Sequence, residues 1–231
     1  MIIVNGILKK GDRIVLCGLN GAITTTVKSI LTPHPLKELR VKNEYLQHEQ
    51  IKAAQGVKIV ASGVDLEKAV PGSPLFLVNN EREEKEAKEI VMRDFEKLKA
   101  NINKEGNGVY VNSSTLGALE ALLHFLKTSK IPVGDFSIGP VHKKDVIKAG
   151  TMIERKMKKF AVILAFDVKI TQEAELEAKK LGVKIMTADI IYHLTDQFQN
   201  YLQKLEEEDR KQHEGEAGKK ENYHLFQFFF F

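Results

Sequence analysis

Three consecutive hydroxyl residues, Ser113, Ser114 and Thr115, stand between an apolar run and an amphipathic segment in GVYVNSSTLGALEALLHFL, residues 108–126. Free backbone amides at the start of a helix bind anions, so this corner could hold a phosphate group. A phosphate-binding loop also needs glycines that let the backbone approach the anion, and a lysine that reaches the terminal phosphates, as in GxxxxGK[ST]. The corner has neither, so we interpret the hydroxyls as helix caps.

Asp167, which follows the apolar run AVILAF, is the best single candidate for an acid or a base, because ligand sites in open α/β sheets gather at the carboxyl ends of strands. No nucleophile or second base stands at a recognisable spacing from it. The seven histidines lack metal-ligand spacing, and Cys17 in RIVLCGL has the surroundings of a small buried hydrophobic residue. We therefore expect no catalytic, cofactor-binding or metal-binding residue, with a small α/β enzyme built around Asp167 as an alternative.

Two pairs of basic residues are candidates for contact with RNA. Lys143 and Lys144 in GPVHKKDVIKAG fall in the first turn of an expected helix, where the helix dipole disfavours cations and an RNA phosphate could compensate. Lys37 and Arg40 form a similar cluster in LTPHPLKELRVKNEY. The formal net charge of the chain is only +4, so binding to RNA would depend on such local clusters.

The elements that position these residues indicate two domains. Residues 1–80 alternate β-rich runs with the turn signals NG, KKGD and LNG, which predicts a small antiparallel β-barrel. Helix formers dominate residues 81–105, which predicts a helical linker. Over residues 106–188, the four apolar runs GVYVN, FSIGP, AVILAFDV and VKIMTA alternate with helical segments. This pattern predicts an α/β/α sandwich with a four-stranded parallel sheet.

One long helix is expected over residues 189–214, because apolar residues recur along it at helical spacing. Leu194, Phe198 and Leu202 lie on this stripe and should anchor the first half of the helix on the sheet. The second half should project into water. The remaining residues, 215–231, end in HLFQFFFF and are expected to form a disordered tail whose phenylalanines favour aggregation.

Composition indicates a folded protein of the cytoplasm. Hydrophobic residues make up 43% of the 231 residues and charged residues 29%, as in ordinary globular proteins. The single cysteine suits a reducing compartment. The sequence does not begin like a signal peptide, and no segment approaches the ~20 apolar residues of a transmembrane helix, so we expect no membrane partner.

Several word-length stretches together resemble the eukaryotic initiation factor 5B group of the initiation factor two family of translational GTPases. The resemblance runs from about Ile2 to about Glu214. The stretches that carry it are LTPHPLKELRVKNEY, IKAAQGVKI, GVYVNSSTLGALEALLHFLKTSKIP, IGPVHKKDVIKAG, AVILAFDVKI and ADIIYHLTDQF. It implies that the barrel is the family's second domain and the sandwich its third. The long helix would then lead towards a C-terminal domain that holds initiator tRNA.

The resemblance also implies a function: promotion of ribosomal subunit joining, with the rRNA and protein of the small ribosomal subunit as partners. Intact family members use GTP and magnesium, but the chain has no P-loop, switch regions or NKxD motif, so we expect no GTPase activity and no cofactor. The family barrel starts upstream of Ile2, so we expect a missing strand and open sheet edges. We therefore expect a non-catalytic fragment that binds ribosomes and relays conformational change; a protein-docking adaptor is a further alternative.

Overall fold

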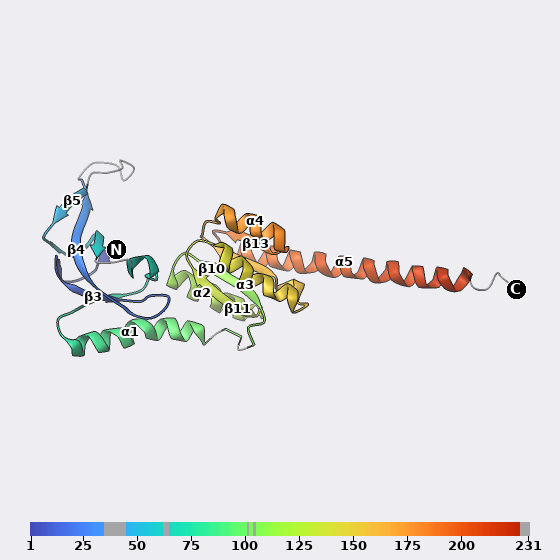
Figure 1. Ribbon diagram of the computed structural model, residues 1–231, viewed down its shortest axis with the longest axis horizontal. Helices are drawn as coiled ribbons and strands as arrows, with labels where there is room; N and C mark the ends of the chain where they lie inside the picture. Colours follow the sequence, from blue (N-terminus) through green and yellow to red (C-terminus); the bar gives the residue numbers. More distant parts are fainter. Residues whose placement is uncertain (35–44, 62–64, 101, 104, 227–231) are drawn as a thin grey trace. The chain divides into compact units, whose positions relative to one another are not determined.

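The computed structural model describes residues 1–34, 45–61, 65–100, 102–103 and 105–226. The chain folds into two compact units. The first unit comprises Met1–Asn101 with Thr115–Gly117, and the second comprises Ile102–Ser114 with Ala118–Phe231 (Figure 1).

The first unit contains the expected antiparallel barrel, which is incomplete. Strand β4 is its longest and bends to pair with β3, β5 and β8; β9 joins on the far side of β3, whereas β1 pairs with β7 and β2 with β6. The strands are β1 (Ile2–Ile3), β2 (Ile7–Lys9), β3 (Arg13–Leu16), β4 (Ile23–Pro33), β5 (Tyr45–His48), β6 (Gln50–Lys52), β7 (Gln55–Gly56), β8 (Lys58–Ala61) and β9 (Leu75–Val78), with a 3₁₀ turn, η1 (Asp65–Lys68).

The barrel core follows from the alternation of apolar and polar residues along these strands. Ile14 on β3 and Ile30 on β4 are fully buried and pack with Leu8 and Ile51 from the paired strands β2 and β6. The KKGD turn between β2 and β3 needs a positive φ angle, which Gly11 supplies at +94°. The turn signals in the sequence therefore mark the ends of these strands.

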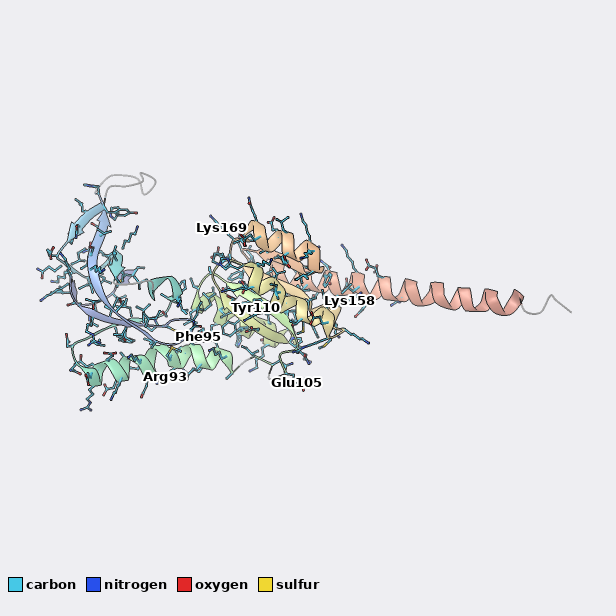
Figure 2. All side chains as sticks on the ribbon, viewed as in Figure 1. Arg93, Phe95, Glu105, Tyr110, Lys158 and Lys169 are labelled. Carbon is cyan, nitrogen blue, oxygen red and sulfur yellow. The ribbon has the colours of Figure 1, made fainter. Side chains whose placement is uncertain are left out.

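Helix α1 (Glu81–Lys99) begins at Asn80, whose side chain accepts a hydrogen bond from the backbone amide of Glu83. The sequence predicted this helix as a linker, but it lies against β3 and β9 and belongs to the first unit. Phe95 is 2% exposed on the packed side of α1, whereas Arg93 points into solvent (Figure 2). The apolar stripe of α1 is thus part of the first unit's core.

The second unit is the predicted α/β/α sandwich around a four-stranded parallel sheet. Its strands lie in the order β11-β10-β12-β13, so the direction of the crossovers reverses between β10 and β12. The strands are β10 (Val109–Ser113), β11 (Val133–Ile138), β12 (Val162–Phe166) and β13 (Lys184–Ala188).

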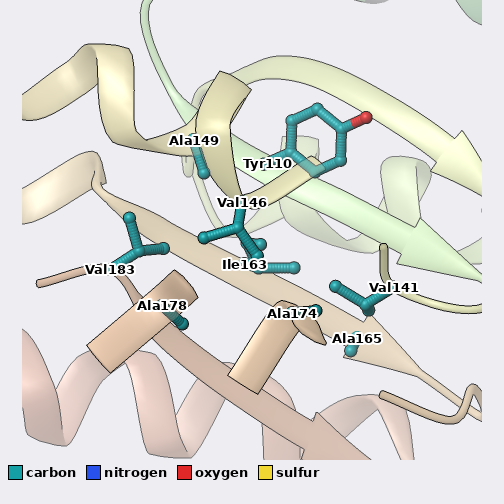
Figure 3. Close-up of a cluster of buried hydrophobic side chains, with 9 residues drawn as sticks. All are labelled: Tyr110, Val141, Val146, Ala149, Ile163, Ala165, Ala174, Ala178 and Val183. Atoms are coloured by element: carbon teal, nitrogen blue, oxygen red, sulfur yellow. The ribbon is translucent and has the colours of Figure 1, made fainter. Parts of the chain in front are cut away.

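Helices cover both faces of this sheet. Helices α3 (Lys143–Glu154) and α4 (Gln172–Leu181) pack on one face, where Val146 and Ala178 meet Tyr110 and Ile163 of the strands in one buried cluster (Figure 3). A 3₁₀ turn, η2 (Lys158–Phe160), precedes β12. Helix α2 (Leu116–Thr128) lies on the other face together with α5 (Ile191–Phe226), to which an aromatic contact joins it.

Helix α5 packs on β12 and β13 and is longer than the sequence predicted. It begins at Ile191 and continues to Phe226, so residues 215–226 are helical where a disordered tail was expected; residues 227–231 lie outside the described residues. The charged composition of 206–221 favours helix as well as solvation, because Glu, Lys, Arg and Gln are all good helix formers. The polar character of these residues therefore does not indicate where α5 ends.

Candidate functional site

Lys143 and Lys144 open α3, as the sequence predicted, but their surroundings differ. Lys143 is half exposed, and its Nζ lies 3.2 Å from a carboxylate oxygen of Glu177 on α4. Lys144 is exposed, and among the described residues no carboxylate pairs with it. An internal carboxylate therefore already balances one of the two cations that the sequence analysis assigned to an external phosphate.

A second carboxylate balances the start of α3. Asp145 is 1% exposed, and its Oδ2 accepts a hydrogen bond from the backbone amide of His142 at 2.9 Å. Its Oδ1 accepts a hydrogen bond from the Tyr110 hydroxyl at 3.0 Å. A negative side chain in the first turn stabilises a helix, so Asp145 offsets the unfavourable position of Lys143 and Lys144 without a ligand.

The Tyr110 side chain makes contacts through both its hydroxyl and its aromatic ring. Burial raises the pKa of its hydroxyl, and the nearby charges of Asp145 and Asp135 raise it further. Lys148 lies with its Nζ 5.8 Å from the centre of the Tyr110 ring and forms an ion pair with Asp135 at 2.8 Å. These contacts tie α3 to β10 and β11, so this polar group is structural.

Lys37 and Arg40, the other predicted RNA contacts, lie outside the described residues. Their role stays a prediction from the sequence.

Asp167 and Ser114 meet where the crossover direction of the parallel sheet reverses, because Ser114 follows β10 and Asp167 follows β12. The Ser114 hydroxyl donates a hydrogen bond to Asp167 Oδ2 at 2.9 Å. The backbone of Asp167 is left-handed, with φ of +51°. Ligands of open α/β sheets usually bind at this place. Among the described residues, no histidine hydrogen-bonds to either side chain, so the pair lacks the base that would activate a serine.

Two more polar side chains stand at the end of β10, directly before Ser114 in the chain. Asn112 and Ser113 at the end of β10 are fully buried. The Asn112 Oδ1 and the Ser113 Oγ have no hydrogen-bond partner among the described residues. The sequence predicted Ser113 as a helix cap together with its neighbours, but Ser113 is the last residue of β10 and its side chain is buried. Such groups are rare, and they are the sole unpaired buried side-chain atoms that the described residues contain.

The base of α5 packs against the sheet. Leu194 is 0% exposed and Phe198 1%, whereas Leu202, one turn further on, is half-buried. Leu194 and Phe198 thus form the buried base of α5, and burial is lower at Leu202.

Two contacts at this base could not be inferred from spacing. Tyr192 of α5 meets Phe125 of α2 edge to face, with ring centres 5.0 Å apart. The Gln197 side chain donates to the backbone carbonyl of Thr187 at the end of β13, at 3.3 Å. The aromatic residues at these positions were visible in the sequence, but their pairing depends on the fold.

Neither a metal centre nor a membrane span is found in the part of the chain that the structure describes. It holds no group of three or more His, Cys, Asp or Glu residues arranged to bind a metal ion. None of its helices combines the length and the apolar character needed to cross a membrane.

A family model described as translation-initiation factor 2 matches residues 81–199, from the start of α1 into α5. The chain belongs to the translation-initiation factor 2 family. The match covers just over half of the chain and includes the parallel sheet with α2, α3 and α4, so the resemblance seen in the sequence is confirmed.

Individual members of the translation-initiation factor 2 family match more of the chain. Eukaryotic translation initiation factor 5B of Saccharomyces cerevisiae is 54% identical over 211 residues, which are 91% of this chain and 21% of the yeast protein. The Homo sapiens factor of the same name is 50% identical over 203 residues, 88% of this chain and 16% of the human protein. The present chain therefore spans about a fifth of the length of these curated relatives.

A solved structure supports the fold. The crystal structure of GDP-bound aIF5B from Aeropyrum pernix matches with a TM-score of 0.62 and 37% identity, over 91% of this chain and 35% of that chain. The antiparallel strands of the first unit, the parallel sandwich and the helix that follows it therefore match the fold of this family member.

Proposed function

We propose that this chain acts in translation initiation, in the cytoplasm, as a non-catalytic part that binds the small ribosomal subunit and relays conformational change during subunit joining. In this proposal the first unit is the family's second domain and the second unit is its third. The observation that carries the proposal is the base of α5, where Leu194 and Phe198 are buried against the sheet and the helix continues to Phe226. The names of the relatives support a role in initiation.

The relay needs a stiff lever and no reactive residue. Helix α5 has 36 residues, which at 1.5 Å per residue gives a length of about 54 Å. A rotation of the sandwich by about 5° would therefore move the far end of a rigid α5 by about 5 Å. The buried side chains at its base are what would make the helix move with the sheet.

In this proposal, guanine nucleotide and magnesium bind to parts of the longer relatives that do not correspond to this chain. The Aeropyrum pernix relative is GDP-bound, but the present sequence has no GxxxxGK[ST] loop, and its residues do not fit that group. Initiator tRNA would likewise bind a domain beyond α5. A titration of the pure chain with GTP or GDP should give no binding signal.

Contact with ribosomal RNA is assigned to Lys143, Lys144, Lys37 and Arg40. Of the two lysines that the structure describes, Lys144 is the stronger candidate, because it is exposed and has no carboxylate partner there. Lys143 would have to exchange its ion pair with Glu177 for a phosphate.

Co-sedimentation with purified small ribosomal subunits tests the proposal. The wild-type chain should pellet with the subunits at low salt, and its affinity should fall as salt rises because phosphate contacts release counterions. Reversal of Lys143 and Lys144 to Glu should weaken binding, with the double reversal of the exposed lysines Lys179 and Lys184 as a matched control. Absence of wild-type binding at low salt would overturn the proposed function. Equal effects of both pairs would remove the contact assignment alone.

The two alternatives have weaker support. An enzyme would be built on Ser114 and Asp167, which hydrogen-bond to each other but not to a described base. A protein-docking adaptor would use the apolar stripe of α5, but Leu194 and Phe198 of this stripe are already buried in the chain's own sandwich. A nucleotide titration that shows turnover would favour the enzyme.

A further inference from the structure

Basic residues gather at the edge of the second unit where its parallel strands begin. Residues 127–132 lead into β11, and residues 154–160 lead into β12. These two segments, here called the amino-edge cluster, contain six basic residues and one acidic residue, Glu154, so their net charge is +5, against +4 for the whole chain. The basic residues are Lys127, Lys130, Arg155, Lys156, Lys158 and Lys159. A concentration of positive charge on one surface attracts a ligand of negative charge.

The two segments form one continuous surface. Strand β10 lies between β11 and β12, and neighbouring strands are about 4.8 Å apart, so the segments are separated by about 10 Å. The loop before β10 lies in this interval. The Val109 amide donates a hydrogen bond to the carbonyl oxygen of Pro132 at 2.9 Å. The Arg155 guanidinium donates to the carbonyl oxygen of Glu105 at 3.1 Å and to Asn107 Oδ1 at 2.8 Å. The sheet therefore holds the lysines of both segments at one edge.

The lysines of the cluster are available to an external anion. All five are exposed, and no carboxylate of the described residues forms an ion pair with them. By contrast, Lys143, Lys148 and Lys180 of the same unit each have a carboxylate oxygen between 2.8 and 3.9 Å away. The exposed glutamates at 105 and at 206–208 make no ion pair with the cluster either.

Two of these lysines occupy positions that favour glycine. Lys130 and Lys156 follow the ends of α2 and α3 in the left-handed region, with φ of +58° and +60°. Helix α4 ends in the same conformation with Gly182, at φ of +73°. The cap needs no side chain there, and a left-handed residue other than glycine costs stability. A cation near a helix C-terminus offsets the dipole, but this accounts for one charge at each helix and not for Lys158 and Lys159.

The surroundings of these lysines favour RNA over a protein or a membrane. None of the large apolar side chains in the two segments is exposed: Ile131 is 9% exposed, and Met157 and Phe160 are partly buried. Protein interfaces contain few lysines and depend on large anchor side chains, and binding to a membrane surface draws on inserted apolar residues. Exposed lysines without an exposed apolar neighbour match the phosphates of a nucleic-acid backbone.

We propose that the amino-edge cluster binds the phosphate backbone of RNA, as a second surface separate from Lys143 and Lys144. Those two lysines open α3 beyond the carboxyl end of β11, whereas Lys156 follows the end of the same helix. The 12 residues of α3 separate the two surfaces by about 18 Å. The sandwich thus contacts RNA at both edges of its sheet, and two contacts to one particle multiply its affinity. The choice of the small ribosomal subunit as that particle rests on the proposed function.

Fluorescence anisotropy of the full chain with a labelled RNA hairpin of about 20 nucleotides tests the phosphate chemistry. Affinity should fall as KCl rises from about 50 mM to about 200 mM. Lys130→Glu with Lys158→Glu, one reversal in each segment, should weaken binding at least about tenfold. Lys179→Glu with Lys204→Glu, at two exposed lysines of the same unit, changes the net charge equally and should weaken binding by less than about threefold. Equal effects of the two pairs, or no effect of the first, would overturn the proposal.

Glycine at the two left-handed positions separates binding from a structural role. Lys130→Gly with Lys156→Gly removes two charges and supplies the residue that this conformation favours. The melting temperature should stay the same or rise. The affinity for the hairpin should fall, and the slope of log affinity against log salt should decrease in size by about 2. A lower melting temperature with unchanged affinity would mean that these lysines only cap helices, which is the opposite of what we propose.

Two further measurements identify the source of the phosphate. In co-sedimentation with small ribosomal subunits, the reversal of Lys130 and Lys158 should weaken binding, and its effect should multiply that of reversing Lys143 and Lys144. If only the latter pair matters, this inference fails and the proposed function stands. If the wild type binds the hairpin but not the subunits, the proposed function fails and the RNA surface stands.

Vesicles made of equal amounts of phosphatidylcholine and phosphatidylserine provide the comparison with a membrane. They should not retain the chain at about 150 mM KCl. Retention that the reversal of Lys130 and Lys158 abolishes would assign the cluster to a lipid surface and contradict the assignment to RNA.

Discussion

The Tyr110 hydroxyl donates a hydrogen bond to the buried Asp145 carboxylate at 3.0 Å, which joins strand β10 to the first turn of α3. Both residues are at most 3% exposed, so neither has water as an alternative partner. Together with the Lys148–Asp135 ion pair and the buried Val146, this contact holds the helix that presents Lys143 and Lys144 to solvent.

Removal of the Tyr110 hydroxyl should destabilise the second unit. Tyr110→Phe leaves Asp145 Oδ1 buried without its donor, which should lower the free energy of unfolding by about 1–3 kcal/mol. Urea denaturation followed by circular dichroism measures this. Tyr192→Phe, at a tyrosine that is 65% exposed, is the matched control and should change stability by less than about 0.5 kcal/mol. Equal effects would mean that the buried hydrogen bond contributes nothing.

The same tyrosine predicts a loss of stability in alkali. Burial raises the pKa of the Tyr110 hydroxyl, so the folded state keeps its proton where the unfolded state, with a pKa of about 10, has lost it. Its contribution is therefore complete below pH 10 and falls above it, by up to about 1.4 kcal/mol per pH unit. The free energy of unfolding, measured by urea denaturation between pH 8 and pH 11, should decline more steeply for the wild type than for Tyr110→Phe. Parallel curves would contradict the assignment to this group.

Helix α1 should unfold with the first unit. Phe95 is 2% exposed in its packed face, so Phe95→Ala should cost about 3–5 kcal/mol of that unit's stability. Ile90→Ala on the same helix, at a residue that is 41% exposed, should cost far less. Native-state hydrogen exchange can follow the two units separately. A destabilisation confined to the second unit, or equal costs at both positions, would show that α1 is the linker that the sequence suggested.

Asp167 should behave as a strained turn residue. Its φ of +51° disfavours most side chains, while Asn and Gly adopt this region readily. Asp167→Asn and Asp167→Gly should therefore leave stability within about 1 kcal/mol of the wild type, and Asp167→Val should lose about 1–2 kcal/mol more than Asp167→Ala. Thermal denaturation ranks the four variants. A loss of ribosomal binding in Asp167→Asn, despite normal stability, would instead give this carboxylate a functional role.

The sequence was sufficient to predict the strands and helices of the sandwich, because their signals are local. The run AVILAFDV predicted β12. The helical segment that follows it is α4, which ends at a left-handed Gly182, a residue type that commonly caps helices. The buried stripe of Leu194 and Phe198 also followed from helical periodicity.

Contacts between distant residues could not be predicted in this way. Tyr110 and Asp145 are separated by 35 positions, and nothing in their spacing indicates that they meet. Glu84 likewise accepts hydrogen bonds from Arg13 and Thr24, and these bonds help to join α1 to the barrel. The sequence showed α1 as a charged helix with one apolar stripe, a pattern that suits a linker and a packed helix equally.

The central claim is that α5 is a rigid extension of the sandwich. Spin labels at Lys179→Cys on α4 and Lys204→Cys on α5 test it, since both positions are exposed and the native Cys17 is buried. Double electron–electron resonance should give one narrow distance distribution, and insertion of two glycines after Leu202 should broaden it. A broad distribution in the uninterrupted chain would contradict the account, because a flexible helix could not transmit the position of the sheet.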